Sequence, residues 1–162
     1  MNKQEGLGKP ASIFSIPKKE VKLSFENSVA QVVELLAYYD YDINAIEDAK
    51  EKSGVEKQLK DMARFYMDGR FENRKNEDGA PIVVQHLFET PGTLKEITYQ
   101  EFTGNIRVAS GDGIEIRKDT FNMAYKMLEG MSGMGTGIRD KLRGADLKAA
   151  EALGNLFFLL MS

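Results

Sequence analysis

A Pro-Gly pair between two apolar stretches is the feature that most constrains the fold of this 162-residue chain. Residues 82–102 read IVVQHLFETPGTLKEITYQEF, with Pro91 and Gly92 near the middle. Proline fixes φ at the second position of a type II turn, and glycine accepts the positive φ needed at the third. Beyond the turn, Ile97 and Tyr99 lie two residues apart and so face the same side of a strand. The stretch therefore predicts an antiparallel β-hairpin with a tight turn.

The chain after this hairpin carries helical patterns. Residues 110–113 predict a turn, and Asp119 is expected to cap the helix that follows it. The apolar face of that helix is expected to consist of Phe121, Ala124, Tyr125, Leu128 and Met131. Residues 130–137 are rich in glycine and predict a helix–helix joint, after which residues 138–143 predict a short amphipathic helix. The last helix is expected to start near Asp146 and to bury Leu147, Ala150, Leu153, Phe157 and Leu160.

The patterns ahead of the hairpin predict a strand and a capped helix. Residues 18–25 alternate, which places Val21, Leu23 and Phe25 on one side of a short strand. Asn27 is suited to cap a helix over residues 28–39, because its side chain can accept from an early helical N–H.

Two capping boxes follow, each pairing an N-cap side chain with a Glu three residues later. The first begins at Asn44 and the second at Ser53. They predict a short helix over residues 45–52 and a longer one over residues 54–68. Gly69 is placed to end the longer helix with a left-handed residue.

These elements predict an α+β fold, mostly helical, with a small antiparallel sheet and helices packed on one of its faces. Residues 1–17 mix Gly, Pro and polar residues and are interpreted as a flexible arm. Residues 70–79 are charged and end in Asp-Gly, which predicts an exposed linker. We therefore divide the chain into an N-terminal, mainly helical part over residues 18–79 and a C-terminal hairpin with helices over residues 80–162.

The composition excludes several classes of function. The chain has no Cys, which rules out disulfides and thiolate chemistry. A net charge of −3 gives no electrostatic drive toward nucleic acid. The sequence holds no apolar run of about 20 residues and no apolar secretory segment near its start. We therefore expect no membrane contact, and we expect the protein in the host cytoplasm.

Residues 40–51 have the oxygen-ligand spacing of an EF-hand calcium loop. The sixth position of such a loop needs Gly for a sharp turn, and here it is Ala45. The eighth position is normally apolar, and here it is Glu47, which a capping box with Asn44 explains without calcium. We expect no metal.

Three other patterns also suggest chemistry, but each has a simpler structural interpretation. Residues 133–137 read GMGTG, yet they follow a predicted helix and lack the Lys-Ser/Thr ending of a phosphate loop. His86 is the only His, on a predicted strand, and is interpreted as a packing residue. Arg70, Arg74 and Lys75 form a basic cluster with a nearby Phe, but acidic neighbours neutralise it. We therefore expect no catalytic residues and no cofactor.

The chain ends in six consecutive apolar residues, 156–161, followed only by Ser162. One helix has a single inward stripe, so about half of such a run must face something other than its own core. The residues expected to bind a partner are Leu156, Phe158, Leu159 and Met161. The alternative is a fully buried last helix.

Three motifs stand in the second half of the chain: ITYQEFTG at the end of the hairpin, the Ser132-Gly133 turn after a helix, and D-L-x-x-x-E-A-L in the last helix, starting at Asp146. Together they resemble motifs of the phage tail assembly chaperones. The resemblance implies a non-enzymatic protein that binds the long helical tape-measure protein, or another tail protein, until tail-tube subunits polymerise around it. It also implies that a frameshifted, longer form can exist.

The sequence is also compatible with two other classes of function. One is a small virion structural protein, such as a baseplate or tail-completion component, and the other is a phage-encoded inhibitor that acts by protein binding. Self-association into a homo-oligomer is compatible with all three. An enzyme is the class of function that the sequence supports least, because no set of candidate catalytic residues stands out in it.

Overall fold

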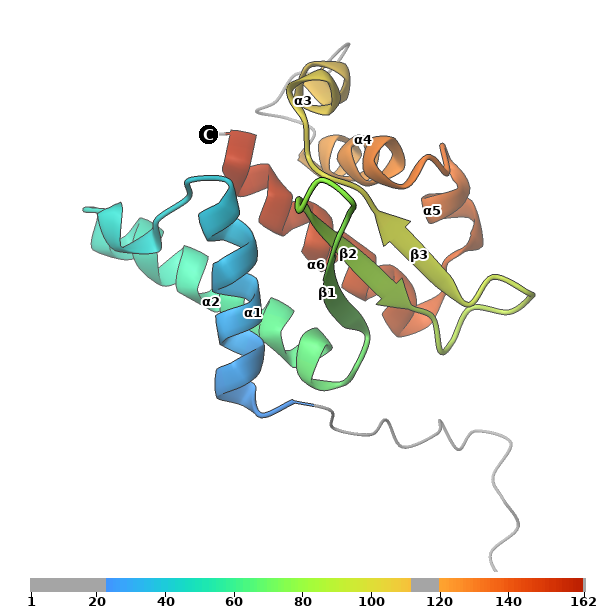
Figure 1. Cartoon of the computed structure of the whole chain (residues 1–162), viewed down its shortest axis with the longest axis horizontal. Coiled ribbons are helices and arrows are strands. Elements are labelled where there is room, and N and C mark those ends of the chain that lie inside the picture. The colour runs from blue at the N-terminus through green and yellow to red at the C-terminus, as the bar shows by residue number, and fades with distance from the viewer. Residues whose placement is uncertain (1–22, 112–119, 162) are drawn as a thin grey trace, which may run out of the picture.

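The computed structural model describes residues 23–111 and 120–161 and has the predicted α+β fold, mostly helical with a small antiparallel sheet (Figure 1). Its helices are α1 (Phe25–Tyr38), α2 (Ala49–Met67), α3 (Gly104–Gly111), α4 (Thr120–Ser132), α5 (Gly137–Lys141) and α6 (Gly144–Phe158), with 3-10 turns η1 (Ile43–Ala45) and η2 (Leu159–Met161). Its strands are β1 (Phe71–Lys75), β2 (Pro81–His86) and β3 (Glu96–Tyr99). Within the described ranges, no helix has the length and apolar character needed to cross a bilayer.

The sheet has the order β1-β2-β3, with β2 in the centre and antiparallel to both neighbours. Helix α6 passes behind the sheet, α1 and α2 lie on the β1 side, and α4 and α5 lie on the β3 side (Figure 1). The face toward α6 carries the buried side chains Phe71, Val83, Gln85, Ile97 and Tyr99. The opposite face carries most of the charged strand residues.

The β2–β3 hairpin confirms the prediction from the Pro-Gly pair. Ile97 lies opposite Gln85, and both Ile97 and Tyr99 are buried on the same face, as their spacing predicted. Gly92 adopts a φ of 104°, the positive value that the predicted turn requires. The connection extends over residues 87–95, so the turn lies in a longer loop and does not join the strands tightly.

The prediction of an exposed linker at residues 70–79 is wrong for its first part. Arg70 and Phe71 are buried, and residues 71–75 form β1, paired along its length with β2. The sequence Phe-Glu-Asn-Arg-Lys puts its charged Glu and Arg on one face and Phe and Asn on the other, which is the alternation of a strand. Only residues 76–79 form a turn, in which Asn76 Oδ1 accepts from the N–H groups of Asp78 (3.0 Å) and Ala80 (2.9 Å).

Helix α1 begins earlier than predicted. Ser24 is its N-cap, and Ser24 Oγ accepts from the N–H of Asn27 (3.1 Å), so Asn27 lies inside the helix. Phe25 is the first helical residue, which makes the predicted strand over residues 18–25 wrong at its C-terminal end. Residues 18–22 of that prediction lie outside the described residues, as does the arm over residues 1–17.

Helix α2 replaces the two helices predicted from the capping boxes. Asp48 is its N-cap, accepting from the N–H of Glu51 (2.7 Å), and Ser53 lies inside the helix. Asn44 belongs to η1, so neither predicted capping box forms. Gly69 ends this region as predicted, with a φ of 74°. Asp48 caps one helix that runs through Ser53 without a break, so the predicted helix start at Ser53 is not used.

The C-terminal helices bury most of the residues that their patterns predicted. In α4, Ala124, Leu128 and Met131 are buried as predicted, whereas Phe121 is 64% exposed. In α6, Ala150, Leu153 and Phe157 are buried, and Leu147 packs at the edge of the core, as does Leu160 in η2. The turn predicted at residues 110–113 is wrong for residues 110 and 111, which belong to α3; its second half and the predicted cap Asp119 lie outside the described residues. Helices α4 and α6 pack closely at Gly154, where a Cβ would lie against Ala124 and Leu128.

We predict that Gly154→Ala destabilises the protein although alanine favours helices. An added Cβ would lie 2.9 Å from Ala124 Cβ and 3.1 Å from Ala124 O, so α4 or α6 must move. The expected loss in the free energy of unfolding is about 1–3 kcal/mol, measured by urea denaturation. Gly54→Ala in α2 is the control: nothing lies within 4 Å of its Cβ. The free energy of unfolding of Gly54→Ala should rise by about 0.5–1 kcal/mol. Equal gains at both positions would contradict close α4–α6 packing.

Candidate functional site

The largest concentration of buried polar groups surrounds the carboxylate of Asp146 in the first turn of α6. Its Oδ1 accepts from Arg70 Nη1 (2.5 Å) and from the N–H of Phe88 (3.0 Å). Its Oδ2 accepts from the N–H groups of Glu89 and Thr90 and from Thr90 Oγ1. Burial alone would raise the pKa of Asp146, but the hydrogen bonds from Phe88, Glu89 and Thr90 outweigh it and lower that pKa. The carboxylate is therefore held in its charged form.

Arg70 is the cation that neutralises this buried carboxylate. Its side chain is fully buried, and its Nη2 donates to Glu89 Oε1 (3.2 Å). The guanidinium lies over the ring of Phe88, 5.4 Å from the centroid. Glu89 Oε2 accepts from the N–H of Ala145 (2.5 Å), close to the start of α6. Arg70 thus joins the segment after α2 to the loop over residues 87–95 and to α6.

Gln85 extends this network into the sheet. Its Nε2 donates to the backbone carbonyl of Asp146 (2.7 Å), and its Oε1 accepts from the hydroxyl of Tyr99 (2.8 Å). Both hydrogen bonds are buried, so they fix β2 and β3 against the N-terminal turn of α6.

This network has the charges of an active site but no access for a substrate. The side chains of Arg70 and Asp146 are each 0% exposed, and neither lines the clefts described below. Every oxygen of Asp146 is already occupied by donors. We interpret the Arg70–Asp146 pair as a structural anchor.

A second ionisable cluster lies on the outer face of the sheet. Glu72 accepts from Arg74 Nε (2.6 Å) and contacts His86 Nε2 (2.9 Å). These hydrogen bonds, chiefly that from Arg74, lower the pKa of Glu72 to about 2. His86 Nδ1 is also 3.8 Å from Glu96 Oε2. The cluster is partly exposed: Glu72 and Arg74 lie two residues apart on β1, and His86 of β2 contacts Glu72 from the neighbouring strand. Polar side chains commonly pair in this way on a sheet face.

The residues that resembled a calcium loop have other structural uses. Asp42 caps η1 by accepting from the N–H of Asn44 (2.8 Å). Asp40 adopts a φ of 57°, which places it in the left-handed region after α1. Across residues 23–111 and 120–161, no group of three or more His, Asp or Glu side chains is arranged to hold a metal ion.

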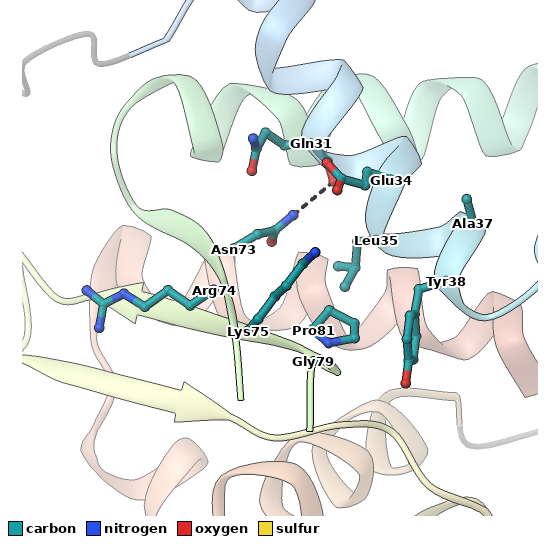
Figure 2. A pocket seen from close by; sticks show the side chains of 10 residues that line it. All are labelled: Gln31, Glu34, Leu35, Ala37, Tyr38, Asn73, Arg74, Lys75, Gly79 and Pro81. Atoms are coloured by element: carbon teal, nitrogen blue, oxygen red, sulfur yellow. Dashed lines mark hydrogen bonds between the residues drawn. The ribbon is translucent and has the colours of Figure 1, made fainter. Parts of the chain in front are cut away.

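A cleft of about 520 Å³ lies between α1 and the β1–β2 hairpin, and we call it the α1–β1 cleft (Figure 2). Ala37 and Tyr38 of α1 and Pro81 of β2 supply apolar surface, and the buried Leu35 lies beneath it. Lys75 reaches into the cleft beside Leu35, whereas Arg74 points away from it (Figure 2). Asn73 bridges the two walls, donating from Nδ2 to the carbonyl of Gln31 (3.0 Å).

The wall formed by β1 is an open sheet edge. The N–H of His86 donates to the carbonyl of Arg70 (2.8 Å), and the N–H of Asn76 donates to the carbonyl of Ala80 (2.9 Å). Hydrogen-bonded pairs alternate in an antiparallel ladder. The register therefore directs the backbone groups of Glu72 and Arg74 toward β2.

The same alternation directs the backbone N–H and C=O groups of Phe71, Asn73 and Lys75 away from β2. Among the described residues, none supplies a hydrogen-bond partner to the N–H of Asn73 or Lys75. These groups can pair with one added strand, and the α1–β1 cleft lies beside them.

The residues that the sequence predicted to bind a partner lie at the end of α6 and in η2. Leu156 is 1% exposed and belongs to the core, so it presents no surface in this fold. Phe158, Leu159 and Met161 are half-buried and pack against the core cluster. Arg107 Nη2 also donates to the carbonyl of Met161 (3.1 Å), which holds this segment against α3.

No protein-family model, curated protein or solved structure matches this chain. The three motifs of the sequence resemblance fall in separate places in the fold. The first ends β3 and enters α3, Ser132 ends α4, and Asp146–Leu153 lies within α6. Arg70, Asp146 and the open edge of β1 were not singled out as a site from the sequence, since each looks locally like an ordinary surface residue or a linker.

We predict that Asp146→Asn destabilises the protein strongly. The asparagine amide would place N–H donors against the N–H groups that Asp146 Oδ2 now accepts from. It would also leave the buried Arg70 without its fully buried carboxylate partner, with only the partly exposed Glu89 still paired to it among the described residues. The free energy of unfolding should fall by about 3–5 kcal/mol in urea denaturation. Asp61→Asn, which removes an exposed pair with Arg64, should cost less than about 1 kcal/mol. A small loss at Asp146 would contradict its anchoring role.

The same carboxylate predicts a pH dependence. Because the folded pKa of Asp146 is lowered, its contribution to stability is complete above the ordinary Asp pKa of about 3.9. That contribution is lost as the pH falls through the lower, folded value. The stability difference between wild type and Asp146→Asn should therefore shrink below about pH 4. Urea denaturation at pH 7, 4 and 3 measures it, and a constant difference would exclude this coupling.

Proposed function

We propose that this protein is a non-enzymatic tail assembly chaperone that binds an extended segment of the tape-measure protein, or of another tail protein, in the α1–β1 cleft. The observation that carries the proposal is the open edge of β1, with outward backbone groups at Asn73 and Lys75 beside a cleft of about 520 Å³. Added strands are a common way for one protein to hold a segment of another.

The chemistry of the cleft supports an extended occupant. The outward N–H and C=O groups of β1 can form main-chain hydrogen bonds that do not depend on the partner's sequence. Ala37, Tyr38 and Pro81 can receive apolar side chains on one side of the added segment. A segment held in this way cannot present its apolar stripe to another copy, which is what a chaperone must prevent.

The exposure of the residues at the two places favours this cleft over the end of α6 as the binding site. Leu156 is buried, and Phe158 with its neighbours already packs against the core. Tyr38, by contrast, is 47% exposed on the wall of the cleft. A partner can reach the cleft without unpacking α6.

We predict that Lys75→Pro abolishes or greatly weakens partner binding while the protein stays folded. The N–H of Lys75 points away from β2, so proline there removes no hydrogen bond within the sheet. It removes one bond to an added strand and blocks its close approach, so affinity for a tape-measure fragment should fall about tenfold or more. Calorimetry with the purified fragment measures the change.

Two controls separate the loss of the backbone hydrogen bond from the loss of the Lys75 charge and from unfolding of the protein. Lys75→Gln removes the charge and keeps the N–H, so it should bind within about threefold of wild type. Arg74→Pro removes a bond between β1 and β2 and should destabilise the fold itself. Wild-type affinity in Lys75→Pro would exclude the β1 edge, and no binding of any tape-measure fragment by the wild type would exclude the chaperone function.

A further inference from the structure

We infer that a groove between α1, η1 and α2 binds a basic amphipathic helix of a partner protein through its apolar floor and its acidic rim. The inference goes beyond the function proposed above and does not depend on it. The groove lies where the chain turns from α1 into α2, at the left in Figure 1. It opens on a different side of α1 from the α1–β1 cleft, and the two share Ala37. We call it the α1–α2 groove.

The lining of the α1–α2 groove is mainly apolar. Leu36 of α1 and Leu59 of α2 are buried in its floor, and Val33, Tyr41 and Ile43 stand around them. Val33 is 41% exposed, so the fold leaves much of this apolar side chain in water. The volume is about 320 Å³, at the lower end of what binding pockets commonly have. The groove therefore has room for a few apolar side chains of a partner and not for a long segment.

The charged side chains that line the groove are both acidic. Asp40 and Asp42 are exposed, and no described residue donates a hydrogen bond to the Asp40 carboxylate or forms an ion pair with it. Asp42 Oδ1 accepts from the N–H of Asn44 (2.8 Å), and its Oδ2 has no donor among the described residues. Burial and, after it, the charge of Glu51 raise the pKa of Tyr41, so a third carboxylate acts at the groove. The rim therefore favours a cation of the partner.

The end of α1 adds to the negative potential at this rim. A helix carries a partial negative charge at its C-terminus, where basic side chains are stabilising. The last turn of α1, which the structure describes in full, holds no basic side chain. Asp40 follows that end with a φ of 57°, a left-handed position that glycine usually takes. Its charge and its backbone conformation both disfavour the folded state, and a bound Lys or Arg would offset the charge.

The backbone around the groove favours a helical occupant. The carbonyl of Leu36 accepts from the N–H of Tyr41 (3.1 Å), and the carbonyl of Ala37 accepts from the N–H of Asp40 (3.0 Å). Because these main-chain groups are paired, an extended segment would find few partners for its own N–H and C=O groups, whereas a helix pairs them internally. Apolar residues at i and i+3 or i+4 of such a helix can enter the groove, and a neighbouring Lys or Arg can reach the rim.

Fluorescence titration of the full-length protein with a synthetic peptide tests the inference. The probe is an amphipathic peptide of about 15 residues made of Leu and Lys, with one Trp as the reporter, since the chain has no Trp. A second peptide carries Glu in place of every Lys. The wild type should bind the Leu-Lys peptide about tenfold more tightly than the Leu-Glu peptide or more, and added salt should weaken that binding. No measurable binding of the Leu-Lys peptide, or equal affinity for both peptides, would overturn the inference.

Two double variants test whether the acidic rim binds the cations of the peptide. Asp40→Asn with Asp42→Asn removes both charges, while asparagine tolerates a left-handed φ and can still cap η1. This variant should stay folded in thermal melting and bind the Leu-Lys peptide about tenfold more weakly than the wild type. Glu77→Gln with Asp78→Asn removes the same net charge from the exposed β1–β2 turn and should bind within about threefold. Equal losses in the two variants would show a response to net charge alone and would exclude the rim.

A matched pair of single variants tests the apolar part of the groove. Val33→Lys places a cation beside the floor and should weaken binding of the Leu-Lys peptide about tenfold or more. Val108→Lys, on the exposed side of α3, should bind within about threefold of the wild type. Equal affinities in these two variants would contradict the inference.

Two further measurements exclude other occupants and other sites. Lys75→Pro, which alters the edge of β1, should bind the Leu-Lys peptide like the wild type, and a loss there would assign the peptide to the α1–β1 cleft and overturn the inference. Sedimentation should show the same oligomeric state in the wild type and in Val33→Lys. Self-association of the wild type that Val33→Lys abolishes would assign the groove to a second copy of the chain, which would also overturn the inference.

Discussion

The buried pair of Arg70 and Asp146 is the interaction on which the rest of the structure depends. Neither charge can be buried alone, since each would lose its hydration without compensation. The side chains are both fully buried and lie 2.5 Å apart. The pair can form only when the end of α2, the loop after β2 and the start of α6 meet, so one contact specifies how three distant parts of the chain assemble. The hydrogen bonds from the loop N–H groups to Asp146 then fix the loop itself.

The anchor also decides which edge of the sheet stays open. Arg70 immediately precedes β1, so holding Arg70 fixes the position at which β1 starts and the face that Phe71 presents to the core. At the other side of the sheet α4 closes on β3, where the N–H of Gln100 donates to the carbonyl of Met131 (2.8 Å). The sheet is therefore covered next to β3 and open along β1, beside the α1–β1 cleft.

The sequence predicted those parts of the fold whose signals are local. The Pro-Gly pair located the hairpin, and the spacing of Ala150, Leu153 and Phe157 located the buried face of α6. Strand β1 was missed because three of its five residues are charged and Phe71 is its only apolar residue, so its composition looks like that of a linker. Arg70 and Asp146 are 76 residues apart, and nothing near either one distinguishes it from a surface charge. The cleft was missed for the same reason, because its walls come from α1 and from a strand that was not predicted.

An open edge and a buried anchor have opposite consequences for binding. Both carboxylate oxygens of Asp146 already accept from several donors, and Arg70 Nε, the one donor of the pair without a partner among the described residues, is buried. The pair therefore acts on the fold and presents no group to a ligand. The outward backbone groups of Asn73 and Lys75 remain to be satisfied by water or by an added strand, whatever its sequence. Selectivity must then come from the side chains around the edge: Glu72 and Arg74 on the outer face, and Ala37 with Tyr38 in the cleft. A segment that places a cation opposite Glu72, an anion opposite Arg74 and an apolar side chain between them satisfies both faces at once.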